Sequence, residues 1–86
     1  MRVLIPSPLR SYTQGKSEVT GSGATLAAML ANLEAAFPGI RFRMIDEQDR
    51  IRRHIRIFVN REQVHDLSAR LSGRDEVQIV CALTGG

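Results

Sequence analysis

The sequence predicts an α+β fold, in which a mixed sheet of about four to five strands has one main helix packed across it. Three observations predict this fold. Apolar residues recur at spacings of three and four over 26–37, as on one face of a helix. Apolar and polar residues alternate over 51–60, and a strand-like apolar run occupies 76–82. The length of 86 residues suits one small domain, which we expect over 1–82, followed by a flexible tail over 83–86.

The N-terminal region is predicted to form a β-hairpin. Residues 2–5 are rich in β-prone side chains, and two nearby prolines end this run. The second strand fits two places: 9–13 or, after a turn that contains Gly15, 17–20. The pattern leaves both positions open.

The helix is the clearest element. Thr25 is a suitable N-cap because its hydroxyl can accept a hydrogen bond from the first helical turn. Pro38 and Gly39 are typical of a helix end. Between these signals the apolar stripe predicts a buried face, formed by Leu26, Met29, Leu30, Leu33 and Phe37.

Beyond the helix the apolar period changes to two. Phe42 and Met44 alternate with arginines, which predicts a half-buried strand over 41–44. In the longer alternation of 51–60 one set of residues is expected to face the core: Ile51, Ile55, Ile57 and Val59. The other set is expected to form an arginine-rich outer face: Arg52, His54, Arg56, Phe58 and Asn60.

The C-terminal part is predicted to contain two turns before the last strand. Residues 60–63 and 72–75 are polar and turn-like. Between them, Asp66 is expected to cap a short helical turn that runs to Leu71. The strand over 76–82 then leads into the tail.

The composition limits the class of protein. No apolar run approaches the length that spans a bilayer, and the N-terminus lacks the features of a signal peptide, so we expect a cytoplasmic protein without a membrane partner. The single cysteine, Cys81, excludes an intrachain disulfide and a cysteine-based zinc cage. The net charge of +3 permits nucleic-acid binding, but the scarcity of aromatic residues for base stacking disfavours it.

The C-terminal dipeptide, Gly85-Gly86, is the most informative feature for function. A chain that ends on two glycines can thread its terminal carboxylate, that of Gly86, into a narrow active site, with Gly85 and Thr84 in the channel. The dipeptide alone is equally compatible with a frayed end. The residues before it decide between these interpretations.

The order of the predicted elements, with a protruding Gly-Gly, is that of the β-grasp fold of ubiquitin-like proteins. The motifs themselves resemble the ThiS/MoaD family of bacterial sulfur carrier proteins over nearly the whole chain. Around the helix they are Ser22-Gly23-Ala24-Thr25-Leu26, Leu30, Leu33-Glu34 and Phe37-Pro38-Gly39-Ile40. Further on they are Arg53-His54-Ile55-Arg56-Ile57-Phe58-Val59-Asn60, Val64, Asp75-Glu76-Val77-Gln78-Ile79 and Gly85-Gly86. The length and the segment Ile5-Pro6-Ser7-Pro8-Leu9-Arg10 look most like the carrier of cysteine biosynthesis.

The resemblance implies a mechanism in which the chain is a substrate and not an enzyme. An adenylyltransferase of the ubiquitin-activating type would use ATP to adenylate Gly86, and a sulfurtransferase or sulfide source would convert it to a thiocarboxylate. The sulfur would pass to an acceptor enzyme: a cysteine-synthase-like enzyme, the large subunit of molybdopterin synthase or a thiazole synthase. The chain itself would hold no cofactor and no catalytic residue. The receiving pathway stays open.

Partner contacts are expected on the outer face of the long strand. An exposed aromatic residue among arginines has the composition of a protein interface, which makes Phe58 a candidate together with Arg53, Arg56 and Arg61. Burial of Phe58 under irregular segments is the equal alternative.

Two other residue types are weighed as sites. Cys81, where the family often has proline, is interpreted as a small hydrophobe of the last strand, although a sulfur-relay role is the alternative. His54 and His65 lack further ligands at suitable spacing, so no metal site is predicted.

Two functions of other classes remain as alternatives. A ubiquitin-like modifier would share the adenylation of Gly86 but end in an isopeptide bond to a lysine. A basic nucleic-acid-binding module would explain the arginines but leave the Gly-Gly without a role.

Overall fold

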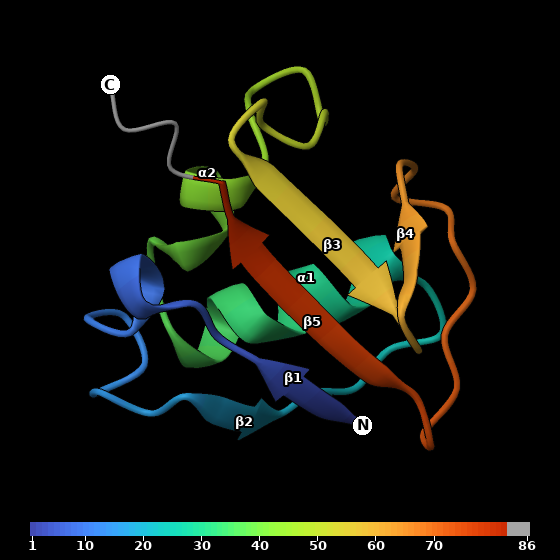
Figure 1. Ribbon diagram of the computed structural model, residues 1–86, viewed down its shortest axis with the longest axis horizontal. Coiled ribbons are helices and arrows are strands. Elements are labelled where there is room, and N and C mark those ends of the chain that lie inside the picture. The colour runs from blue at the N-terminus through green and yellow to red at the C-terminus, as the bar shows by residue number, and fades with distance from the viewer. Residues whose placement is uncertain (83–86) are drawn as a thin grey trace.

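The computed structural model describes residues 1–82 (Figure 1). The elements follow one another as β1 (Arg2–Leu4), a 3₁₀ turn η1 (Ser7–Leu9), β2 (Glu18–Thr20), α1 (Leu26–Ala36), α2 (Ile40–Met44), β3 (Ile55–Val59), β4 (Glu62–Val64) and β5 (Glu76–Cys81). The predicted α+β architecture with one main helix is confirmed. The short helix α2 is an addition to it.

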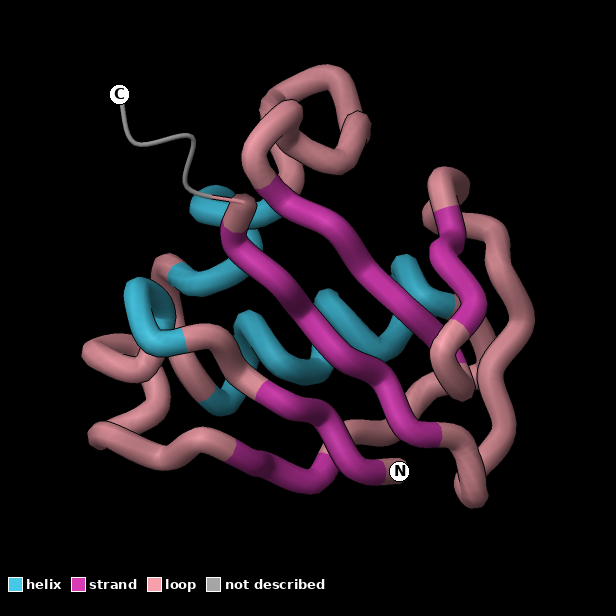
Figure 2. The backbone as a smooth tube through the Cα atoms, viewed as in Figure 1, coloured by secondary structure: helices cyan, strands magenta, loops and turns pink. Residues whose placement is uncertain are grey.

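The five strands form one mixed sheet in the order β2-β1-β5-β3-β4 (Figure 2). The central strands β1 and β5 run parallel, with Val3 opposite Val77, and the other neighbours are antiparallel. The helix α1 crosses one face of this sheet, as Figure 1 shows. The arrangement is the β-grasp.

A single apolar core lies between α1 and the sheet. The inward residues of the strands alternate with outward ones, so Val3, Ile57 and Val77 are fully buried while their neighbours face outward. On the helix, the predicted stripe supplies the facing side chains, and Leu26, Met29, Leu30 and Leu33 are buried. Phe37, the last member of the stripe, is half-buried.

The start of α1 is held by the chain around it. The hydroxyl of Thr25 accepts a hydrogen bond from Ala28 N (3.2 Å), so the predicted N-cap is confirmed. Two other N–H groups of the first helical turn have no acceptor within the helix. These are the N–H groups of Leu26 and Ala27, which donate to the carbonyls of Ala69 and Leu67 (2.9 Å each). The segment before β5 therefore satisfies the helix end that the sequence of α1 leaves open.

Gly23 allows the chain to approach the helix closely. Its φ is +147°, and a Cβ at this position would lie 2.5 Å from the backbone nitrogen of Met29. Because backbone atoms of a helix cannot move aside, only glycine fits here.

In the N-terminal hairpin, the second strand is the later of the two alternatives. It spans Glu18–Thr20 and pairs with β1 through Val3 and Val19. The earlier position, 9–13, consists of the end of η1 and turns, and Leu9 is buried there.

The predicted strand over 41–44 is wrong, because these residues form α2. Gly39 adopts a φ of +97° and reverses the chain, and the carboxylate of Glu34 accepts hydrogen bonds from Gly39 N (2.8 Å) and Arg41 N (2.9 Å). In the helix, Ile40 and Met44 lie on one buried face, four residues apart. Phe42 points away and is 55% exposed.

The region over 51–60 and the turn at 60–63 also differ from the predictions. The strand β3 begins only at Ile55, while Ile51 forms an isolated bridge with Ile45. Asn60 and Arg61 have φ values of 51° and 73° and make a tight two-residue turn, after which β4 pairs back onto β3. The turn is therefore limited to Asn60 and Arg61, and Glu62 and Gln63 of the predicted turn belong to β4, which was not predicted.

Asp66 caps a turn and not a helix. Its carboxylate accepts a hydrogen bond from Ser68 N (2.8 Å), and Ala69 N donates to its carbonyl (3.2 Å). The chain then extends, and Arg70 forms a bridge with Thr25. The later turn is confirmed, since Asp75 N donates to Ser72 O.

Candidate functional site

The root of the C-terminal tail is fixed at one end of the sheet. The last strand β5 ends with Cys81 opposite Ile55 of β3. Ala82 N then donates to His54 O at 2.7 Å, which holds the chain against the segment before β3. The predicted reactive residues, Thr84, Gly85 and Gly86, lie outside the described residues. They stay a prediction.

Cys81 lies at the edge of the apolar core, as a residue with a structural role would. Its side chain is half-buried against the core, and burial raises the pKa of its thiol above the ordinary value of 9.0. A raised pKa keeps the sulfur protonated near neutral pH, whereas a nucleophilic cysteine needs thiolate. These observations favour the interpretation of Cys81 as a small hydrophobe.

The face of the sheet opposite α1 carries a mixed apolar and polar surface. Phe58 of β3 lies between Gln63 of β4 and Gln78 of β5, and Leu4 of β1 lies beyond Gln78. Phe58, Leu4 and Val80 are half-buried there. We call this surface the outer face. It adjoins the tail root, because Val80 immediately precedes Cys81.

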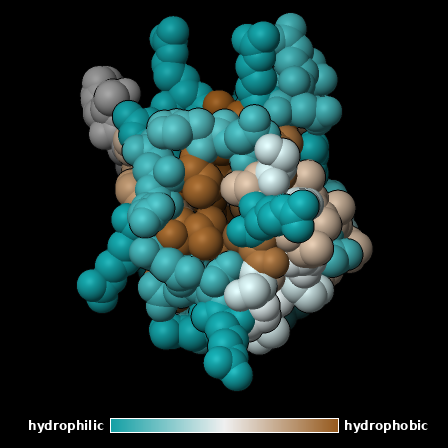
Figure 3. Space-filling model, turned by 90° about the vertical axis from the view of Figure 1, so that its right-hand side faces the viewer, coloured by the Kyte–Doolittle hydropathy of each residue, from teal (hydrophilic) through white to brown (hydrophobic). Residues whose placement is uncertain are grey.

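A second surface lies on the side of the molecule where β4 forms the sheet edge. There, hydrophobic atoms lie in a hollow surrounded by hydrophilic side chains (Figure 3). The hollow is an open groove of about 960 Å³, lined by 49–53, 55–56 and 63–68 with Thr25, Ala27 and Arg41. We call it the arginine groove.

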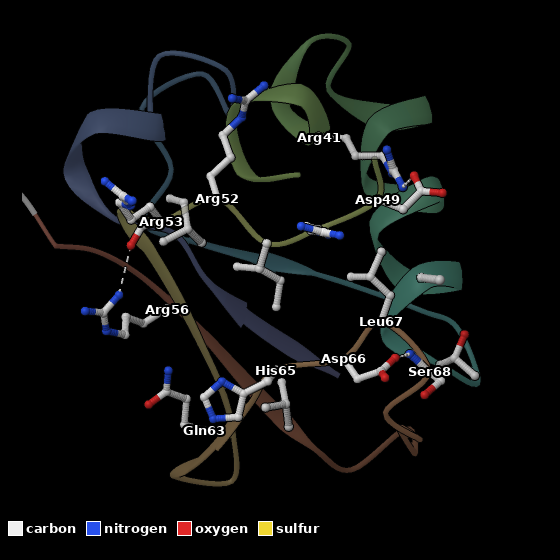
Figure 4. Close-up of a pocket in the computed structure, with 16 residues that line it drawn as sticks. Arg41, Asp49, Arg52, Arg53, Arg56, Gln63, His65, Asp66, Leu67 and Ser68 are labelled. Carbon is white, nitrogen blue, oxygen red and sulfur yellow. Dashed lines mark hydrogen bonds and ion pairs between the residues drawn. The ribbon is translucent and has the colours of Figure 1, made fainter. Parts of the chain in front are cut away.

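The structure distributes the predicted partner-binding residues over both surfaces. Phe58 belongs to the outer face, with Arg56 two residues before it on β3. Arg53 and Arg56 line the arginine groove, where Arg56 Nη1 donates to Arg53 O at 3.1 Å (Figure 4). Arg61 lies in the turn beyond the other end of β3.

The sequence pattern missed the most exposed aromatic residue, Phe42. The guanidinium of Arg52 lies 4.5 Å from the centroid of its ring, and Arg52 Nε donates to Phe42 O (2.7 Å). Nearby, Arg43 Nε donates to Tyr12 Oη (2.6 Å). In the sequence, the apolar residues Ile40 and Met44 are four apart, as on one face of a helix. This spacing would have predicted that Phe42 points outward.

The carboxylates with perturbed pKa values serve local structure. The pKa of Asp75 is lowered mainly by hydrogen bonds from Ser72 N and the Asn60 side chain. Hydrogen bonds from backbone N–H groups likewise lower the pKa values of Glu34, Asp46 and Asp66. Carboxylates used in this way stabilise turns and helix ends, and they do not form an acid–base pair.

Within residues 1–82, no three His, Cys, Asp or Glu side chains gather as metal ligands would. The helices of the same residues are too short or too polar for one to cross a bilayer.

Comparison with known proteins identifies relatives over the full length. A family model described as the ThiS family matches residues 3–86. The CysO proteins of Mycobacterium tuberculosis and Mycobacterium bovis, each described as a sulfur carrier protein, are 37% identical over 89 residues, which cover 98% of this chain and 96% of each relative.

Solved structures of CysO proteins have the same fold as this chain. CysO of Amycolatopsis orientalis, crystallised in a complex with BexX, superposes with a TM-score of 0.92 at 33% identity, over 99% of this chain and 98% of that one. Mycobacterium tuberculosis CysO gives 0.90 at 36% identity, over 94% and 97%. Small archaeal modifier protein 1 of Methanosarcina acetivorans shares the fold, with a TM-score of 0.81 at 22% identity over 99% and 94%.

Proposed function

The chain belongs to the ThiS family, and we propose that it is a sulfur carrier protein that works through the carboxylate of Gly86. One observation carries this proposal: the family match runs from residue 3 to Gly86 and so includes the terminal Gly-Gly. The identity of 37% to CysO over 98% of the chain supports the same function. It favours cysteine biosynthesis as the receiving pathway.

The chemistry requires activation of a poor electrophile. A Gly86 carboxylate oxygen attacks the α-phosphorus of ATP, pyrophosphate leaves, and a mixed anhydride with AMP forms. Hydrosulfide then attacks the carbonyl carbon and AMP departs, which leaves a thiocarboxylate. Where a persulfide is the donor, a further thiol must cleave the S–S bond of the acyl product. The thiocarboxylate sulfur is a soft nucleophile that an acceptor enzyme can use.

The folded domain contributes recognition to this scheme and no catalytic group. ATP and the sulfur donor belong to the partners, which we expect to be an adenylyltransferase and a sulfurtransferase or sulfide source. The outer face adjoins the tail root, so a partner that receives the tail meets Phe58, Leu4 and Val80. The Amycolatopsis orientalis CysO complexed with BexX supports action through docking on other proteins.

The proposal is tested by intact-mass spectrometry. The full chain is incubated with ATP, sulfide and an adenylyltransferase that is active on a CysO protein. We expect a mass gain equal to the replacement of one oxygen by sulfur, mapped to the C-terminal peptide. A chain that lacks Gly86 should gain nothing, although its thermal unfolding should match that of the intact chain because the core ends before Ala82.

Two outcomes contradict the proposal. A mass that stays unchanged, while the same enzyme converts its own carrier, excludes activation of this chain by that class of enzyme. Covalent conjugates to lysines of other proteins, without thiocarboxylate, would instead indicate a ubiquitin-like modifier.

A further inference from the structure

The floor of the arginine groove is apolar and continues the core. Ile51, Val64 and Leu67 are half-buried and pack against the core, and Ile55 beside them is 3% exposed. These residues come from the loop before β3, from β3 and β4, and from the turn after β4. Their exposed carbon surface would leave water if a further apolar side chain entered the groove.

The groove exists because β4 is shorter than β3. The strand β4 pairs only with Ile57, Phe58 and Val59. Ile55 and Arg56 pair with β5 on one side but have no strand on the other side. The N–H of Ile55 already donates to Arg52 O (2.9 Å), so the gap beside β3 is a space for side chains and not a free row of backbone groups.

The rim of the groove is positively charged. Five arginines line it: Arg41, Arg50, Arg52, Arg53 and Arg56. Figure 4 shows Arg52, Arg53 and Arg56 along one side. The two aspartates of the lining are already engaged, since Asp49 pairs with Arg41 (3.3 Å) and Asp66 accepts from Ser68 N.

Two of these arginines lack a partner within the described part of the chain. Among residues 1–82, the side chains of Arg50 and Arg53 make no hydrogen bond or ion pair, and both residues are exposed. Guanidinium groups in this position suit carboxylates, which they bind with paired hydrogen bonds.

We propose that the arginine groove binds an extended acidic segment of a partner protein. One apolar side chain of that segment lies over Ile51, Val64 and Leu67, and carboxylates on either side of it meet Arg50, Arg53 and Arg56. An extended segment fits better than a small ligand, because the groove is open and its arginines are spread along the rim, whereas small-ligand sites enclose most of their ligand.

This surface is separate from the tail and goes beyond the carrier function. The tail root contacts the start of β3 through Ala82 and His54, on the β5 side, and the groove lies on the opposite side of the same strand. A partner can therefore hold the groove while the tail occupies an active site. Two linked contacts of this kind raise the effective concentration of the tail at that site.

The test is an NMR titration of the full-length ¹⁵N-labelled chain with a nine-residue peptide that has three acidic residues on each side of a Leu-Val-Leu centre. We expect saturable shifts of the amides of Ile51, Ile55 and Val64. The double variant Arg53→Glu, Arg56→Glu should weaken binding by roughly tenfold or more, because two attractive contacts become repulsive.

Matched controls separate the groove from simple charge attraction. Arg74→Glu changes the charge by the same amount per site at an exposed turn outside the groove, and it should leave the affinity within roughly twofold of the original. A peptide with a serine centre should bind at least roughly tenfold more weakly, because it lacks the apolar anchor. Deletion of Gly86 should change nothing in the titration.

Several results overturn the proposal. These are the absence of saturable shifts, shifts confined to Phe58 and Gln78 of the outer face, equal binding of the serine-centred peptide, and an Arg74→Glu effect clearly above the twofold range. If pyrophosphate displaces the peptide when both are at the same concentration, the groove is a site for small anions and not for a peptide. The titration needs no adenylyltransferase, ATP or sulfide and does not depend on Gly86, so its failure is distinct from failure of the carrier function, which rests on the proposed chemistry at Gly86.

Discussion

The inner and outer sides of β3 show how this small domain divides stability from recognition. The inner residues Ile55 and Ile57 are at most 3% exposed and pack beneath α1. The adjacent outer residue Arg56 is exposed and lies at the rim of the arginine groove. A period of two therefore places the two tasks on alternate residues of one strand. Substitutions on the inner side should affect folding, and substitutions on the outer side should affect binding.

The largest effect should come from Leu33→Ala in α1. Leu33 is 3% exposed within the core, so truncation removes apolar contacts and leaves a cavity. We expect the free energy of unfolding to fall by about 2–5 kcal/mol. Urea denaturation followed by circular dichroism measures it.

Phe42→Ala is the matched truncation on the surface. Phe42 is 55% exposed and contacts Arg52, so its loss should lower the stability by about 0.5–1 kcal/mol. Equal destabilisation by the two truncations would contradict the division between the core and the surface.

A backbone substitution should come next. Gly23→Ala places a Cβ 2.5 Å from Met29 N at a φ of +147°, and we expect a loss of about 1–3 kcal/mol. At Gly73 a Cβ meets nothing within 4 Å, so Gly73→Ala should change the stability by no more than about 0.5 kcal/mol. Thermal unfolding of both variants tests the close approach of the chain to α1. Similar melting temperatures would contradict it.

Thr25→Ala removes the N-cap of α1. The expected loss is about 1 kcal/mol, because one helix N–H loses its acceptor. Thr25→Ser keeps the hydroxyl and should restore most of this loss. A Ser variant as unstable as the Ala variant would show that the methyl group, and not the cap, supports the helix.

The smallest effect should be a pH dependence from Asp75. Hydrogen bonds from Ser72 N and Asn60 lower the pKa of Asp75 below its ordinary value of 3.8. Its contribution is therefore complete above pH 3.8 and is lost as the pH falls further, through the lower pKa of the folded state. Asp75→Asn should flatten this acid-side decline of the urea midpoint. An unchanged decline would assign it to other carboxylates.

The parts of the fold that the sequence predicted correctly carry strong local signals. In α1, the Thr25 cap and the apolar stripe agree, and Pro38-Gly39 marks the end. The last strand likewise is mostly apolar, with Val77, Ile79, Val80 and Cys81 interrupted only by Gln78. Where several local preferences point to one structure, tertiary contacts have little to override.

The errors fall where a short pattern fits two structures. Over 41–44, alternation of two apolar and two arginine residues fits a strand, but the buried pair Ile40 and Met44 fits a helical turn equally well. The hairpin of β3 and β4 was missed because its turn contains Asn60 and Arg61, without the glycine that usually accompanies positive φ.

The candidate site divides in the same way. The Gly-Gly terminus is visible in the sequence because it is one local motif. The arginine groove is not, since its lining comes from α1, the loop before β3, and the residues around β4. Such a surface forms only when the sheet register leaves Ile55 and Arg56 beyond the end of β4.

The hydrogen bond between Ala82 N and His54 O fixes the point on the domain from which the tail must reach a partner's active site. Gly86 lies four residues beyond this point, and a polypeptide spans at most about 3.6 Å per residue, so the Gly86 carbonyl reaches no further than about 14 Å from Ala82. Any enzyme that acts on Gly86 must place its reactive centre within that depth of the surface on which the domain rests. An active site deeper than this could not reach Gly86 while the domain rests on that surface.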